Sequence, residues 1–284
     1  MARRHYNIEN KVPQYWGAWE FVIDLTSATS LTVGVFSTTS NYSTSYNRKP
    51  TLIIDWGDGT TETKELAATS TTHQHTFPSK SVFTVHIDEV FIPNEEQARV
   101  TKLLFNAQSY DCLTHINIYK SDEITNIDQI CNNRKKLIGF GNGFKFEVPN
   151  CLTTSGTFYG CTGLTSLPSG IFDIMTKITS FYYICPNCTG LTSLPSKLFR
   201  YNTKCTNYSQ IFAYCSALTA NLNDVFDGAT LNKVINTSYG FRNCKITGEA
   251  LPIIAKLTSA TTISGTFNNC TTLTDYTSIP ATWK

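Results

Sequence analysis

The nine residues Cys161-Thr-Gly-Leu-Thr-Ser-Leu-Pro-Ser169 recur without a single change at Cys188-Thr-Gly-Leu-Thr-Ser-Leu-Pro-Ser196. The cysteine that opens each stretch belongs to a series of five, at intervals of 27, 27, 29 and 26 residues: Cys161, Cys188, Cys215, Cys244 and Cys270. Leucine follows three residues after four of these five cysteines. Self-similarity at such a period predicts repeated units that stack on one another and share a core.

The repeated pattern, Phe-x-x-Cys-x-x-Leu-x-x-Leu-Pro, resembles the BspA-like leucine-rich repeats of surface proteins from gut and oral bacteria and some of their phages. The resemblance covers residues 131–280, with a degenerate first turn expected at residues 113–118. It implies a leucine-rich-repeat solenoid over residues 94–284, with one short strand in each repeat. It also implies a binding surface on that solenoid.

Before residue 93 the texture of the sequence is different, because short runs alternate apolar and polar residues. The runs cover residues 19–25, 31–36, 52–56, 61–66 and 82–87. Alternation with period two indicates half-buried strands, and this spacing is typical of an antiparallel sandwich. We therefore expect a β-rich protein of two domains.

One motif makes the sandwich more specific. Asp55-Trp-Gly-Asp-Gly-Thr60, followed by His75-Thr-Phe77 and Val82-Phe-Thr-Val85, resembles the PKD domain. The resemblance implies an immunoglobulin-like sandwich, which we place at residues 18–93. Residues 1–17 are then an N-terminal arm.

Composition argues against nucleic acid as a partner and against a membrane span. Charged residues make up only 15% of the 284 residues, and the formal net charge is +2, too small for a phosphate-binding surface. No apolar stretch approaches the roughly 18 residues of a membrane span. The first residues lack the apolar core of a secretory signal, so we expect either a protein used without secretion or one whose signal was removed.

Several motifs have both a chemical and a structural interpretation. Asp55 and Asp58 are a weak calcium candidate, but the pattern of an EF-hand loop is missing. The pair His73 and His75 fits strand packing better than metal binding. The series of repeat cysteines, including the Cys185-Pro-Asn-Cys188 match to redox and zinc motifs, is expected to form a buried thiol column. We predict no catalytic residue, metal or cofactor, although two carboxylates brought together by folding remain an alternative that would make a glycosidase.

The predicted ligand site is a set of outward residues on the repeats. Short hydroxyl side chains supply donors and acceptors, and tyrosines supply flat area with a polar tip. The alternative is that the hydroxyls only make a soluble face. The candidate residues are Thr165, Ser166, Thr192, Ser193, Thr219, Thr274, Tyr159, Tyr182, Tyr183 and Tyr214.

These features together predict a non-enzymatic structural or recognition protein. The first hypothesis is a phage virion component, a fibre or decoration protein, whose arm docks onto virion proteins and whose repeats bind a host-surface glycan or protein. The alternative is an adhesin or glycan-binding lipoprotein of the bacterial cell surface with its signal removed. A homo-oligomer is compatible with either.

Overall fold

The structure is a computed structural model that describes residues 14–15, 19–41, 43, 45, 48–67, 71–91, 97–105, 111–118, 124–140 and 146–284. For residues 14, 15 and 91 it describes the backbone alone. Apart from the backbone of β1, the N-terminal arm therefore lies outside the described residues, together with its predicted role in docking.

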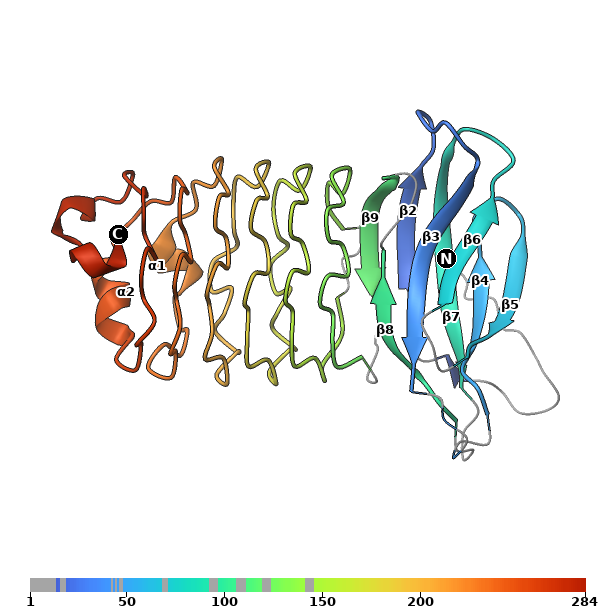
Figure 1. Cartoon of the computed structure of the whole chain (residues 1–284), viewed down its shortest axis with the longest axis horizontal. Coiled ribbons are helices and arrows are strands. Elements are labelled where there is room, and N and C mark those ends of the chain that lie inside the picture. The colour runs from blue at the N-terminus through green and yellow to red at the C-terminus, as the bar shows by residue number, and fades with distance from the viewer. Residues whose placement is uncertain are drawn as a thin grey trace.

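Two antiparallel sheets face each other at one end of the molecule (Figure 1). The larger has the strand order β5-β4-β7-β2-β9, with β1 also paired to β7, and the smaller has the order β6-β3-β8. Alternate side chains of β2 and β4 are buried, as the period-two pattern requires. The strands are β1 (Gln14–Tyr15), β2 (Trp19–Asp24), β3 (Thr32–Ser40), β4 (Thr51–Asp55), β5 (Thr61–Glu65), β6 (Thr71–Thr76), β7 (Val82–Phe91), β8 (Val100–Leu104) and β9 (Leu113–Ile118).

The expected strands before residue 93 are confirmed as β2, β3, β4, β5 and β7, within a few residues at their ends. Residues 113–118 were expected to form a degenerate first turn of the repeats, and they do make parallel bridges to the following segments at His115↔Gly139 and Ile118↔Phe146. They form β9, which pairs antiparallel with β2 from Trp19↔Ile118 onward. The sequence did not indicate the pairing with β2. This segment is the edge strand of the larger sheet, and the coils continue from it.

The expectation of a leucine-rich-repeat solenoid over residues 94–284 is wrong. After β9 the described residues contain no strand, so no sheet of one strand per repeat is formed. The repeats instead make irregular coils joined by isolated parallel bridges, such as Thr153↔Ser180 and Ser180↔Asn207. The helices are short, namely α1 (Leu222–Val225), α2 (Leu251–Lys256), and the 3-10 turns η1 (Tyr276–Ser278) and η2 (Ala281–Trp283).

Left-handed backbone explains why the coils contain no strand. Each coil has two residues with φ between 52° and 66°, four positions apart, as at Tyr183 and Asn187. A positive φ ends an extended run, so only single residues pair between neighbouring coils. The six pairs are Gln129 and Asn133, Gly156 and Gly160, Tyr183 and Asn187, Gln210 and Tyr214, Tyr239 and Asn243, and Gly265 and Asn269.

The coils continue directly from the edges of the two sheets (Figure 1). Ile138 N donates to Thr114 O of β9 at 3.0 Å, and Phe105 N, just after β8, donates to Ile130 O at 2.8 Å. These bonds cover edges that would otherwise expose unpaired backbone groups. One cluster of buried side chains consequently runs from Trp19 in the sandwich to Trp283 at the C-terminal end.

Candidate functional site

The predicted threonines do form a row on the coils. Thr192 N donates to Thr165 O at 2.9 Å, and Thr219 N donates to Thr192 O at 3.0 Å. All six predicted hydroxyl residues are exposed, and Ser166 and Ser193 are bridged directly. Thr247, which sequence reasoning missed, continues the row, because its Oγ1 donates to Thr219 O at 3.4 Å. Thr274 follows in the next coil, where its N–H donates to Gly248 O at 3.0 Å.

Three of the predicted hydroxyl groups already have partners. The Oγ1 atoms of Thr192 and Thr219 donate to the carbonyl of the preceding coil at 3.1 and 3.2 Å. Thr274 Oγ1 donates to Gly248 O at 3.0 Å. The hydroxyl protons of these three threonines therefore stabilise the contact between coils, and only their lone pairs remain for a ligand.

The predicted tyrosines lie apart from the hydroxyl row, at the left-handed turns. The rings of Tyr159 and Tyr183 are stacked with centroids 5.1 Å apart, and Tyr182 stacks on Tyr183 at 5.4 Å. Tyr182 and Tyr214 are 39% and 38% exposed. Burial, followed by the neighbouring Tyr159, raises the pKa of Tyr183, and Tyr214 is close enough to contribute.

Arg242 and Tyr239 extend this group, and sequence reasoning missed both. The guanidinium carbon of Arg242 lies 5.5 Å from the ring centroid of Tyr214 and 5.3 Å from that of Tyr239. Both distances fall within the range of a cation–π contact. For Tyr239 the available signal was the repeat itself, since Tyr239 lies five residues before Cys244, just as Tyr183 lies five residues before Cys188. We call the set of Tyr159, Tyr182, Tyr183, Tyr214, Tyr239 and Arg242 the tyrosine cluster.

The predicted cysteine column is present in the core. Each of its five members is at most 2% exposed, and each Sγ donates to a carbonyl at 2.9 or 3.0 Å, as from Cys188 to Phe158 O. Burial raises the pKa of Cys270 to about 12. All ten cysteines are unpaired and buried. The column therefore serves as packing, which is what the structural interpretation of these residues predicts.

In the sandwich, Asp58 is occupied by its own hairpin. Its Oδ1 accepts from Thr60 N at 2.9 Å and from Thr60 Oγ1 at 2.6 Å, and its Oδ2 lies 2.7 Å from His75 Nε2. Burial alone raises the pKa of Asp58, but the bonds from Thr60 and His75 outweigh it and hold the pKa below its usual value. Asp55 Oδ1 accepts from Gly57 N at 3.0 Å. The carboxylates of the calcium candidate thus hold the turn.

His73 is a core residue of β6. It is completely buried, its Nε2 lies 2.8 Å from Thr38 Oγ1, and its ring stacks on Phe36 at 4.4 Å. Burial lowers its pKa to about 4. Strand packing with one hydrogen bond is therefore the interpretation that the geometry supports. Among the described residues there is no group of three or more His, Cys, Asp or Glu residues placed to hold a metal.

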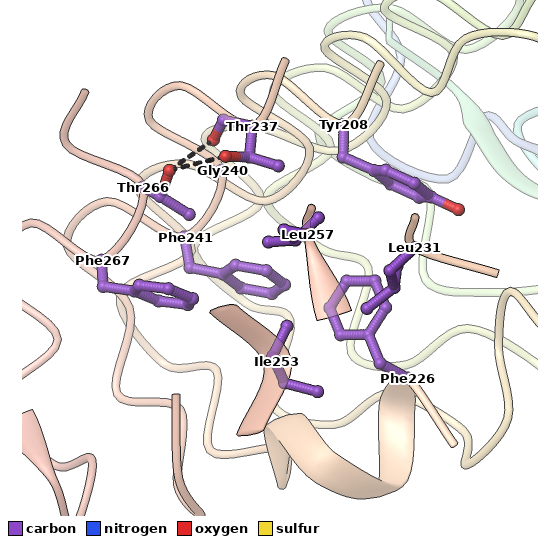
Figure 2. Close-up of a pocket in the computed structure, with 10 residues that line it drawn as sticks. All are labelled: Tyr208, Phe226, Leu231, Thr237, Gly240, Phe241, Ile253, Leu257, Thr266 and Phe267. Atoms are coloured by element: carbon purple, nitrogen blue, oxygen red, sulfur yellow. Dashed lines mark hydrogen bonds between the residues drawn. The ribbon is translucent and has the colours of Figure 1, made fainter. Parts of the chain in front are cut away.

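Two hollows remain. Figure 2 shows a cavity of about 20 Å³ between coils, where Phe226, Phe241 and Phe267 lie among its lining and the hydroxyls of Thr237 and Thr266 bond each other at 2.9 Å. This volume holds one water at most, and its polar groups are already paired. A larger groove of about 380 Å³ lies on the sandwich, beside Trp56, Gln74 and His75. Of these two hollows, the groove is the one with the size of a ligand site.

Comparison of the chain with protein-family models, with curated proteins and with solved structures finds no match. The resemblances to PKD domains and to BspA-like repeats therefore stay sequence-based interpretations. In the part of the chain that the structure describes, no helix is long and apolar enough to cross a membrane.

Proposed function

We propose that the protein is a non-enzymatic recognition protein that binds a neutral glycan, or a similar uncharged polar surface, through the tyrosine cluster. The observation that carries the proposal is the grouping of these rings at the surface. Tyr159, Tyr182 and Tyr183 stack on one another, and Tyr214 and Tyr239 both contact Arg242. Tyrosine offers a large, rigid contact area with a polar tip and loses little side-chain entropy on binding. Sugar rings present both apolar faces and hydroxyls, which match that surface.

The backbone holds the cluster in place. Tyr183, Tyr214 and Tyr239 stand at left-handed positions with φ of 59°, 64° and 55°. These turns are tied to the next coil, since Tyr183 N donates to Ser209 O at 3.0 Å and Tyr214 N donates to Arg242 O at 2.7 Å. A preorganised surface loses less freedom when a ligand binds.

Two acidic residues of the coils, Asp275 and Asp128, have structural partners, which favours recognition over hydrolysis at these positions. Both carboxylate oxygens of Asp275 accept backbone N–H groups at the start of α2, from Ala250 at 2.9 Å and Leu251 at 2.7 Å. Asp128 Oδ1 accepts from Ser155 N at 2.5 Å. A glycosidase needs two carboxylates facing a substrate, and these two are engaged in holding the backbone.

The test is binding of the purified full chain to a printed glycan array and to bacterial cells. The double variant Tyr182→Ala/Tyr214→Ala should weaken binding at least about tenfold, the usual loss when two aromatic anchors are removed. Tyr201→Ala is the matched control, because Tyr201 is 41% exposed and packs against Arg200 outside the cluster. Binding that survives the double variant, or an array that captures nothing, would refute the proposal.

Thr165→Lys/Thr192→Lys is the second arm of the same experiment, because it changes the hydroxyl row and leaves the cluster intact. Retained binding in this variant assigns recognition to the tyrosines. Lost binding with an unchanged melting temperature would move the site to the hydroxyl row.

The cellular location belongs to the same proposal. As a virion fibre or decoration protein the chain would present the cluster to a host cell, and as a cell-surface adhesin it would present the cluster to another cell or a matrix. Mass spectrometry of purified virions and of envelope fractions separates the two locations. Absence from purified virions would remove the first.

A further inference from the structure

The groove on the sandwich lies at the end of the molecule away from the coils. It is bounded by residues of β3, β6 and the β4–β5 hairpin, and Figure 1 places β5 and β6 at the end opposite β9. Its volume of about 380 Å³ suits a small ligand or one unit of a polymer. The groove therefore does not share residues with the tyrosine cluster.

The polar groups around the groove are neutral in sum and partly unused. Glu62 is paired with Lys64 at 3.1 Å, which cancels its charge. Within the described part of the chain, the side chains of Thr61 and Gln74 make no hydrogen bond to another residue, and both are exposed. The hydroxyls of Thr32 and Thr76 bond each other at 2.8 Å and retain further capacity. Such a lining suits an uncharged ligand that carries several hydroxyl groups.

The ring of His75, which borders the groove, is held in one orientation by Asp58 and Trp56. Its Nε2 lies 2.7 Å from Asp58 Oδ2, so in the neutral ring Nε2 carries the proton and Nδ1 is an acceptor. The ring is stacked on Trp56 with centroids 4.5 Å apart and planes 6° apart. Asp58, whose side chain is 2% exposed, is itself held by Thr60. A side chain supported in this way is preorganised for binding.

We propose that this groove binds a neutral polyhydroxylated ligand, a single pyranose ring, with Gln74, Thr61 and His75 as its hydrogen-bonding residues. The site is separate from the tyrosine cluster and does not depend on the function proposed for it. A ligand of this size that makes a few hydrogen bonds in an open groove has a Kd on the order of 1 mM.

The test is saturation-transfer-difference NMR on the full chain, with methyl β-glucoside, methyl β-galactoside and methyl α-mannoside as probes. Each probe is used at about 20 mM, roughly twenty times the expected Kd. Gln74→Trp fills the groove from a strand position that accepts an aromatic side chain. Thr72→Trp is the matched control, because Thr72 lies two residues away on the same strand and is also exposed, but is outside the groove.

We expect a saturation-transfer signal from at least one probe. Gln74→Trp should weaken this signal at least tenfold, whereas Thr72→Trp and Tyr182→Ala/Tyr214→Ala should leave it unchanged. Silence of all three probes would overturn the proposal, as would equal signals in both tryptophan variants. Signals that disappear only in the tyrosine variant would also overturn it, while supporting recognition by the tyrosine cluster. The two proposals therefore fail separately.

Discussion

Replacing Leu191 by Ala tests the register of the repeat most directly. Leu191 is completely buried, so the change removes three buried carbons and leaves a cavity between coils. At about 0.8 kcal/mol for each carbon, the transfer part is about 2.4 kcal/mol, and the cavity brings the expected loss of unfolding free energy to about 3–4 kcal/mol.

The neighbouring Thr192→Ala is the internal reference. Thr192 is exposed, and its hydroxyl donates to Thr165 O at 3.1 Å on the surface. Loss of one exposed hydrogen bond costs about 0.5 kcal/mol and should stay below about 1 kcal/mol. The two substitutions are adjacent in the chain, so any difference between them reports which face of the coil is buried.

Urea unfolding of the full chain, followed by tryptophan fluorescence and far-UV circular dichroism, measures both losses. Because one core joins the sandwich and the coils, we expect the two probes to give coincident transitions. The identical stretch in the preceding coil gives a replicate, Leu164→Ala against Thr165→Ala. Equal losses for the leucine and threonine variants, or a loss below about 1 kcal/mol for Leu191→Ala, would refute the register.

Three further predictions concern other parts of the molecule. The ten buried cysteines should react with iodoacetamide only after unfolding, because burial keeps the reagent away from the sulfur atoms and also raises the pKa of thiols such as Cys270. Rapid labelling of the native chain would contradict the column. The pKa of His73 is about 4 in the folded chain and about 6.5 when unfolded. The unfolding free energy should therefore fall by on the order of 3 kcal/mol as the pH drops from 6.5 to 4. His73→Phe should flatten this pH dependence in urea titrations. By the same assay, Gly57→Ala should lower the unfolding free energy by more than about 2 kcal/mol and Gly59→Ala by about 1 kcal/mol. Both glycines have a positive φ, but only at Gly57 would a Cβ lie 2.2 Å from Thr84 O. Similar losses for the two variants would mean that the hairpin does not approach β7 this closely.

Much of the sandwich was predictable because its signals are local. Alternation in runs such as residues 19–25 follows from a strand that buries one face, and it needs no knowledge of the partner strand. The pairing of β9 with β2 was not predicted, because it depends on an edge of β2 that exists only after the sheet has formed. The groove was not predicted for a related reason, since Thr32 and Gln74 come together only after β3 and β6 pair.

The candidate sites were predictable in part. The threonine row follows from the repeat, because equivalent residues of successive units must occupy equivalent places. The separation of the tyrosines from that row depends on left-handed backbone at Tyr183, Tyr214 and Tyr239. Tyrosine has no preference for that conformation, so its sequence position carries no signal of the turn.

The sequence by itself determined the repeat, its register and its buried positions, because a cysteine or leucine that recurs at a fixed interval must meet the same packing in each unit. Only the tertiary structure decided the shape of each unit. Hydrogen bonds between coils, such as Tyr183 N to Ser209 O, fix paired left-handed turns where the repeat pattern alone indicated a strand. The physical reason is that backbone bonds to a neighbouring coil repay the cost of an unfavourable φ, and that neighbour exists only after the chain has folded.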